Sequence, residues 1–207
     1  MNGSMALPIP GPIPVAAGTA VDLSDNFSTN PLTSRWSDLW GASVWNGSAT
    51  FGAASGSYAK YNTAVGGVNQ YGKFTIASSD PDGGCIFRST GTASDGFYIG
   101  VVLNGGDVYF SRGSSTGWLA DMGGASALTI AEGDTVAMTL TGTGAETTLR
   151  VWKNTTANIP DSVSSWDSRA ADITKTASGG VYYDTGNYIG VGIDASYNID
   201  NWYGGSL

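Results

Sequence analysis

The chain has 207 residues, a length that fits one domain with a sizeable core. Its 9 basic and 17 acidic side chains give a net charge of −8, which argues against nucleic acid as a partner. Histidine is absent, which excludes Ser-His-Asp and Cys-His catalysis and His-ligated zinc, and no apolar stretch approaches the ~20 residues of a membrane helix.

Residues 1–20 are predicted to form an extended, Pro-rich N-terminal arm, separate from a domain over residues 21–207. In "LPIPGPIPV" four prolines alternate with other residues, and each proline fixes its φ angle and removes a backbone donor, which favours polyproline II. The segment is either a disordered leader or an arm that binds a neighbouring subunit. In the second case the contact residues are Leu7, Pro8, Ile9, Pro10, Pro12, Ile13, Pro14 and Val15.

From residue 21 onward, apolar residues alternate with polar or small ones, and glycine-containing turns separate these runs. The pattern predicts about twelve to fourteen strands and one short helical turn within residues 162–173. Antiparallel strands with one apolar face each must pair those faces. The predicted fold class is therefore all-β, a two-sheet antiparallel sandwich.

The single cysteine, Cys85, excludes an intrachain disulfide and is predicted to be a small apolar residue of a strand. The N-terminus lacks the charged and apolar regions of a signal peptide. We therefore expect either folding in a cytoplasm or a mature form whose leader was removed.

Three stretches carry a family resemblance: "VDLSDNFSTNPLTSRWS" (21–37), "EGDTVAMTLTGTGAETTLRVWKN" (132–154) and "GNYIGVGIDASYNIDNWYGGSL" (186–207). They resemble motifs of the concanavalin A-like lectin and glucanase (laminin-G-like) jelly rolls, of the type found in bacteriophage virion surface proteins, with Trp202 in place of the usual Phe. The resemblance implies a jelly-roll sandwich whose first and last strands pair. In that arrangement Ile189, Val191, Ile193 and Ile199 fill the core.

The same resemblance implies a structural calcium where the first and last strands meet. Asp25 and Asp200 occupy the matching positions, and Asp80 and Asp82 form a second oxygen-rich turn. Calcium binds six to eight oxygens, several of them charged, and neither place offers a dense cluster. No cofactor is required in this interpretation, and a calcium ion would contribute stability only.

The glucanase branch of this fold uses a Glu-x-Asp-x-x-Glu strand, in which two glutamates share one face. This chain has only two glutamates, Glu132 and Glu146, which we expect in separate turns. The sequence therefore predicts that the protein is not an enzyme. A lyase that uses Tyr with Arg or Lys stays an alternative.

Seven large side chains are predicted to project from the non-core side of central strands. They are Tyr71, Lys73, Arg88, Tyr98, Tyr109, Arg150 and Trp152. Five of them, Tyr98, Tyr109, Arg88, Arg150 and Trp152, are the predicted ligand-binding residues, because sugars stack on aromatic rings and bond to polar groups around them. The same residue types anchor protein interfaces, and a third alternative is that they only cover core edges. Four tryptophans, Trp36, Trp40, Trp45 and Trp166, are predicted to plug the ends of the sandwich.

These observations favour a non-catalytic structural and adhesive module on a virus particle, a bacteriophage capsid decoration or fibre protein. Its partners would be capsid or tail proteins and a cell-surface glycan, with no nucleic acid or membrane, and we expect a homo-oligomer. Its location would be the virion surface after assembly in the host cytoplasm, or else extracellular. The alternative function is a free carbohydrate-binding module for a bacterial or algal polysaccharide, and a third is a β-glucan hydrolase or lyase.

Overall fold

The computed structural model describes residues 21–32, 34–45, 50–79, 82–92, 96–103, 106–114, 117–179, 181–193 and 198–207. The predicted N-terminal arm, with its contact residues from Leu7 to Val15, lies outside these ranges, as does Asp80. Within the described ranges, no helix has the length and apolar character needed to cross a membrane.

The regular structure of the described residues consists of sixteen strands and one short 3-10 turn, so the strand count exceeds the prediction. The strands are β1 (Asp22–Asp25), β2 (Trp36–Trp45), β3 (Phe51–Tyr61), β4 (Gln70–Ile76), β5 (Gly83–Ser89), β6 (Phe97–Leu103), β7 (Asp107–Ser114), β8 (Gly117–Asp121), β9 (Ser126–Ala127), β10 (Thr135–Thr141), β11 (Thr148–Lys153), β12 (Ser165–Trp166), β13 (Arg169–Ala170), β14 (Ile173–Thr176), β15 (Tyr188–Ile193) and β16 (Asn198–Ser206). The 3-10 turn η1 (Gly144–Glu146) joins β10 to β11.

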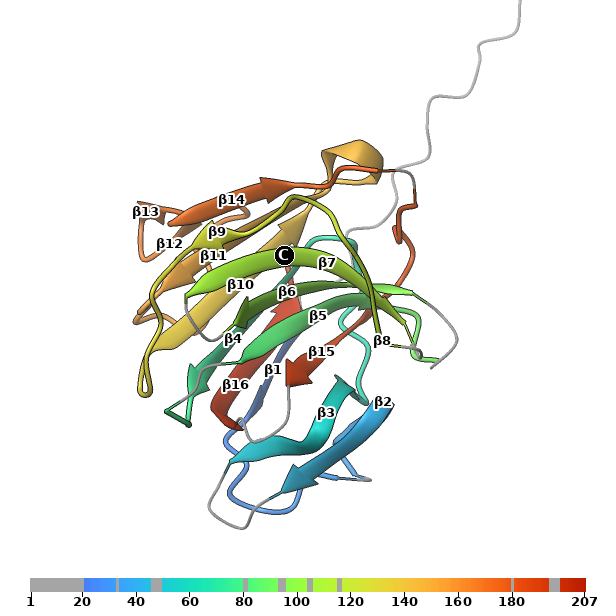
Figure 1. Ribbon diagram of the computed structural model, residues 1–207, viewed down its shortest axis with the longest axis vertical. Coiled ribbons are helices and arrows are strands. Elements are labelled where there is room, and N and C mark those ends of the chain that lie inside the picture. Colours follow the sequence, from blue (N-terminus) through green and yellow to red (C-terminus); the bar gives the residue numbers. More distant parts are fainter. Residues whose placement is uncertain are drawn as a thin grey trace, which may run out of the picture.

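Two antiparallel layers form the molecule, and Figure 1 shows the arched strands β5 to β7 in front of β10 and β4. The first layer has the order β14-β11-β10-β4-β16, and β1 lies along β16. The second has the order β3-β15-β5-β6-β7-β8, with β2 on β3 and β9 on β7. The layers are joined where Asn198 and Ile199 of β16 pair with β3. The predicted two-sheet sandwich is confirmed, and so is the pairing of the first strand with the last.

The main core lies between the two layers. Alternation on β10, β11 and β15 points the predicted residues into it, and they include Val136, Met138, Leu140, Leu149, Val151, Ile189, Val191 and Ile193. The layers approach closely at Gly72 of β4 and Gly100 of β6. A Cβ atom on Gly72 would lie 2.5 Å from the Cys85 sulfur, and one on Gly100 would lie 2.7 Å from the Met138 sulfur. Cys85 is fully buried, as predicted, and burial raises the pKa of its thiol.

The predicted facing of β6 is wrong. Tyr98 belongs to the main core, whereas Phe97, Ile99 and Val101 lie in a second apolar cluster with Leu39 and Ile86. Both faces of β6 are apolar, so alternation alone does not say which face meets the other sheet. The second layer therefore carries buried apolar side chains on each of its two faces.

Residues 162–173 hold the two-stranded hairpin β12–β13 where the sequence predicted a helical turn. Its two loop residues, Asp167 and Ser168, have φ angles of 54° and 57°, the geometry of the tight hairpin turn with two left-handed residues. The hairpin covers the outer face of the first layer. Trp166 packs there against Trp152 and Tyr71, with ring centroids 5.7 and 5.9 Å apart, so it does not plug a sandwich end.

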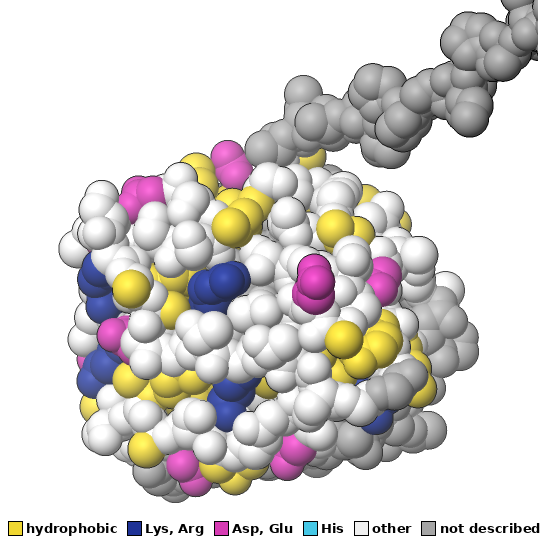
Figure 2. All heavy atoms as spheres, turned by 90° about the horizontal axis from the view of Figure 1, so that it is seen from above, with side chains coloured by type: hydrophobic (Ala, Val, Ile, Leu, Met, Phe, Trp, Pro, Cys, Tyr) yellow, Lys and Arg dark blue, Asp and Glu magenta, His cyan; other side chains and the backbone are white. Residues whose placement is uncertain are grey.

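Charged side chains are sparse on the surface. On the face drawn in Figure 2, most acidic and basic side chains are separated by uncharged atoms, and a few lie next to one another at the left edge. This distribution follows from the composition, in which charged residues make up 13% of the chain.

Candidate functional site

The five predicted ligand-binding residues do not converge on one exposed face. Arg88, Tyr98 and Trp152 are fully buried, so none of the three is exposed to a ligand, although Trp152 does project from the predicted non-core side. Trp152 lies under the β12–β13 hairpin, and Tyr98 points into the main core. Tyr109 on β7 and Arg150 on β11 are half-buried, but they belong to different layers.

The two glutamates and the remaining tryptophans considered in the sequence analysis also lie in different parts of the fold. Glu132 lies in the turn before β10 and Glu146 in η1, as expected, so no strand presents a pair of glutamates. Trp36 lies inside the main core, and Trp45 packs partly against it. Trp40 is half-buried beside Tyr58, at a centroid distance of 5.3 Å.

The predicted calcium site at Asp25 and Asp200 does not fit these residues. The Asp25 carboxylate accepts hydrogen bonds from Arg35 Nε at 2.7 Å, Trp36 Nε1 at 2.9 Å and the Phe27 N–H at 2.8 Å. Asp200 accepts from the backbone N–H and the side-chain amide of Asn201. Among the described residues, no three Asp, Glu, Cys or His side chains group as a metal site. Asp25 already has its charge matched by an arginine.

The loop after β1 is held in one shape by short local hydrogen bonds. Asp25, Asn26 and Asn30 each accept a bond from the backbone N–H two residues further on, which is the Asx-turn pattern. Phe27 has a φ angle of 50°, and its carbonyl oxygen accepts a bond from Trp45 Nε1 at 2.8 Å. This loop therefore presents its polar side chains in a fixed arrangement.

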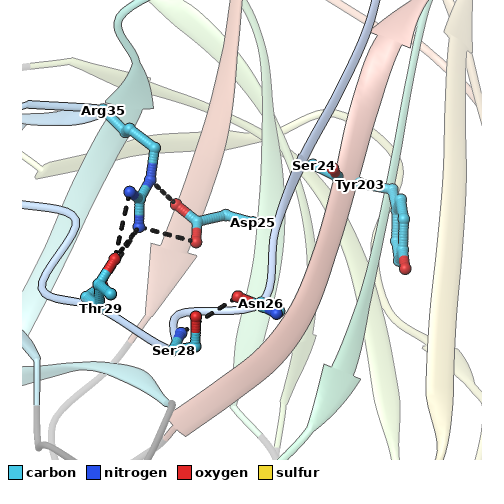
Figure 3. A pocket seen from close by; sticks show the side chains of 7 residues that line it. All are labelled: Ser24, Asp25, Asn26, Ser28, Thr29, Arg35 and Tyr203. Carbon is cyan, nitrogen blue, oxygen red and sulfur yellow. Dashed lines mark hydrogen bonds and ion pairs between the residues drawn. The ribbon is translucent and has the colours of Figure 1, made fainter.

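A groove of about 360 Å³ opens beside this loop, and Figure 3 shows the side chains that line it. The lining residues are Ser24, Asp25, Asn26, Ser28, Thr29, Arg35 and Tyr203. Arg35 binds both Asp25 oxygens and the Thr29 hydroxyl and carbonyl oxygens. A guanidinium has five N–H groups, so these bonds leave one on Nη1 for another acceptor. The Arg35 side chain is 34% exposed, whereas that of Asp25 is 2% exposed.

A second groove, of about 240 Å³, lies on the other side of Tyr203. Its lining combines apolar and polar side chains: Asp22, Leu23, Ser24, Tyr71, Asn158, Ile159 and Tyr203. Ser24 and Tyr203 line both grooves and face each other in the β1–β16 pairing. Tyr203 and Ser24 therefore link the two grooves, and we call this pair of grooves the Tyr203 site.

A buried lysine fixes the far wall of the second groove. Lys73 Nζ donates to the Thr155 and Ala157 carbonyl oxygens at 3.0 and 2.8 Å. It also donates to Asn158 Oδ1 at 3.2 Å and lies 6.0 Å from the centre of the Tyr203 ring. Burial lowers the pKa of Lys73. Because an ammonium has three N–H groups, these three acceptors match its donors and hold Asn158 in place.

Of the residues that line the Tyr203 site, the sequence interpretation singled out only Asp25, as a metal ligand, and Tyr71, as an outward-facing ring; it missed the others. Two signals were present: the Asx-rich run "DNFSTN" marks a rigid loop, and alternation places Tyr203 opposite the buried Trp202. The closing strand was interpreted as architectural only. It does seal the core through Ile199 and Trp202, but its other face carries Tyr203.

The fold defined by these layers is a jelly-roll sandwich of the concanavalin A-like type. No family model matches the chain, and no curated protein matches it in sequence. Among solved structures it is similar to the carbohydrate binding module CBM66 from Bacillus subtilis, with a TM-score of 0.54 and 13% identity over 80% of this chain and 91% of that one.

The metal-free exoplasmic/lumenal domain of VIP36 is similar with a TM-score of 0.52 and 12% identity, over 90% of this chain and 91% of that one. The legume lectin-like domain from Entamoeba histolytica gives a TM-score of 0.47 and 9% identity, over 89% and 97% of the two chains. The similarity to the first two structures, at 13% and 12% identity, shows the fold alone.

Proposed function

We propose that this chain is a carbohydrate-binding module that holds an uncharged glycan in the Tyr203 site without transforming it. The observation that carries the proposal is that the half-buried Tyr203 lines both a polar groove and a partly apolar one. Sugars present CH-rich faces that pack on aromatic rings and hydroxyl groups that bond to polar side chains. A carbohydrate binding module with the same fold, from Bacillus subtilis, supports the choice of ligand class.

The polar groove supplies hydrogen-bonding groups that no other described residue occupies. They are the hydroxyl groups of Ser24, Ser28 and Tyr203 and the amide nitrogen of Asn26, while Asn26 Oδ1 holds the loop through Ser28 N–H. The remaining N–H of Arg35 adds a donor to this set. Because the loop is already fixed by its Asx turns, little conformational entropy is lost when a ligand binds.

Binding rather than hydrolysis is favoured by the state of the carboxylates in the two grooves. Asp25 is engaged by Arg35, Trp36 and the loop backbone, and its side chain is 2% exposed. Asp22 accepts a bond from the Tyr71 hydroxyl at 2.6 Å. Glycoside hydrolysis needs two carboxyl groups that flank the scissile bond, one of them able to donate a proton. Because Asp25 lacks that freedom, the Tyr203 site does not offer two free carboxyl groups.

The test is an array of bacterial and algal polysaccharides and their oligosaccharides, probed with the wild-type chain and with Tyr203→Ala. We expect wild-type binding to at least one glycan and a loss of at least about tenfold in affinity for the variant, equal to about 1.4 kcal/mol. Tyr109→Ala is the matched control, because it removes a half-buried tyrosine from the other layer. The proposal is wrong if no glycan binds, or if Tyr203→Ala binds as the wild type does.

The role on a virus particle stays a prediction. It depends on the N-terminal arm, on capsid or tail partners and on a homo-oligomer, and the arm lies outside the described residues. Deletion of residues 1–20 followed by a particle-binding assay tests the arm, and light scattering of the purified chain tests the oligomer. A glycan-binding module carried on a particle surface would satisfy both interpretations.

A further inference from the structure

A third cavity, of about 380 Å³, is separate from the two grooves of the Tyr203 site and lies where β5 ends and β6 begins. Tyr182, Tyr183, Asp184 and Thr185 form one side of it, and glycines contribute to its lining. It shares no lining residue with the Tyr203 site. We call it the Asp184 pocket.

A fully buried arginine supports the Asp184 pocket. Arg88 Nε donates to the Val68 carbonyl oxygen at 2.7 Å, and Nη2 donates to the Gly142 carbonyl oxygen. Nη1 donates to Thr147 Oγ1 at 3.4 Å and to Asp184 Oδ1 at 3.1 Å. Arg88 also has a φ angle of 57° at the end of β5. Burial of a charged group and a positive φ angle at a residue other than glycine both cost free energy. Strained and buried charged residues of this kind are found preferentially at functional sites.

A second buried polar residue locks the loop that carries Asp184. Gln70 is 0% exposed, accepts a bond from the Arg88 N–H at 2.8 Å and donates to the Gly186 carbonyl oxygen at 3.3 Å. A Cβ atom on Gly186 would collide with the Arg88 carbonyl oxygen, so only glycine allows the loop to lie this close. The pocket wall is therefore built on a rigid base.

Asp184 presents an oriented acceptor at the pocket surface. Its carboxylate accepts bonds from Arg88 Nη1 at 3.1 Å and from the Gly144 N–H at 2.9 Å, and its side chain is still 33% exposed. A carboxylate has about four acceptor positions, so two hold the loop and the others are left for a ligand. Beside it, Tyr183 is fixed by a bond from its N–H to the Tyr98 hydroxyl at 3.1 Å.

We propose that the Asp184 pocket is a second sugar-binding site, in which Asp184 accepts hydrogen bonds from neighbouring sugar hydroxyl groups and the tyrosine rings pack on the CH face. Charge-assisted bonds to a carboxylate are among the stronger hydrogen bonds, and the half-buried Tyr182 and Tyr183 line the same pocket as Asp184. Arg88 is a positioning residue, because it is buried beneath the carboxylate and acts through it. Two separate sites on one chain raise the avidity for a polysaccharide that reaches both.

The experiment is a titration of the ¹⁵N-labelled full chain with methyl glycosides of glucose, galactose, mannose and N-acetylglucosamine, followed by amide chemical shifts. We expect at least one of them to shift the amides of Asp184, Thr185 and Gly186, apart from any shifts near Tyr203. Thr185→Arg places a bulky side chain on an exposed residue of the lining and leaves the Arg88 bonds intact, so it should abolish these shifts. Asp184→Asn should weaken binding at this pocket by at least about tenfold.

The outcomes separate this inference from the proposed function. Shifts confined to the Tyr203 site overturn the second site and leave the first standing. Shifts confined to the Asp184 pocket support the inference and overturn the placement of the first site. Shifts at residues 184–186 that persist in Thr185→Arg, or the absence of shifts there with all four sugars, overturn the inference.

Discussion

Two arginine–aspartate pairs lie beside the two sites, and their burial is reversed. In the pair at the Tyr203 site, Arg35 and Asp25 lie 2.7 Å apart, with side chains 34% and 2% exposed. In the pair at the Asp184 pocket, Arg88 and Asp184 lie 3.1 Å apart, with side chains 0% and 33% exposed. In each pair the buried residue, Asp25 or Arg88, forms hydrogen bonds to several segments of the chain, and the more exposed residue, Arg35 or Asp184, lines the cavity.

This reversal means that the two pairs present groups of opposite hydrogen-bonding character to their cavities. A guanidinium only donates hydrogen bonds, and a carboxylate only accepts them. The Tyr203 site therefore offers a donor where the Asp184 pocket offers an acceptor. A sugar hydroxyl does both, so one class of ligand fits both places through different atoms.

The largest expected effect tests the buried arginine. Asp184→Ala leaves the buried Arg88 cation without its counter-ion. Because Asp184 is 33% exposed and solvent screens part of the pair, we expect a cost of about 2–3 kcal/mol of unfolding free energy. Urea unfolding followed by tryptophan fluorescence measures this. Thr185→Ala, at the exposed neighbouring position, should stay within about 0.5 kcal/mol of the wild type. A cost below about 1 kcal/mol for Asp184→Ala would mean that water replaces the carboxylate without loss, which contradicts the comparison.

The other pair should respond to a similar extent when its exposed member is removed. Arg35→Leu leaves the Asp25 carboxylate, 2% exposed, without its counter-ion and with bonds only from Trp36 Nε1 and the Phe27 N–H, so we expect a cost of about 1.5–3 kcal/mol in the same unfolding assay. Arg169→Leu serves as the matched control. Its pair with Asp172 is exposed on both sides, at 38% and 32%, and should cost below about 1 kcal/mol. Equal costs for Arg35→Leu and Arg169→Leu would contradict the importance of the buried member.

A third buried cation allows a test by pH. Burial lowers the pKa of Lys73 in the folded chain, whereas the unfolded chain keeps a value near 10.5. Between these two values the unfolded state binds more protons, so this group's contribution to stability rises with pH. We expect Lys73→Met to lose about 1 kcal/mol at pH 7, because three hydrogen bonds disappear, and to fall further behind the wild type toward pH 10. Urea unfolding of both proteins at pH 7 and pH 10 measures this difference in unfolding free energy. A difference that is the same at both pH values would contradict the prediction.

Alternation predicted the fold well where a strand has one apolar face. On β10, Val136 and Met138 point into the core, while Thr139 points to the outer face and bonds to the Val163 carbonyl oxygen. It failed on β6, where Tyr98 and Ile99 are both buried on opposite faces. Tertiary packing decides such a strand, because either face suits an apolar environment.

The sites were less predictable, because each joins residues that are distant in the sequence. Tyr203 meets the loop after β1 only through the β1–β16 pairing, and Asp184 meets Arg88 only through loop packing. Arginine is a residue usually found exposed, so a fully buried Arg88 runs against the expectation from its type. The run "DNFSTN" indicated a rigid loop with Asx turns, but nothing in the local sequence indicated that Tyr203 lies beside this loop.

The smallest expected effect concerns salt. Because Arg35 is already paired with Asp25 and Asp184 with Arg88, the charges of each pair largely cancel at its cavity. Binding of an uncharged sugar should then change by less than about twofold between low and high salt, since screening acts on unpaired charges. Affinities measured by isothermal titration calorimetry at both ionic strengths check this for the wild type and for Tyr203→Ala. A marked weakening of binding by salt would indicate an anionic sugar at Arg35. The remaining N–H of Arg35 would then bind a charged group, and the two cavities would select different ligands.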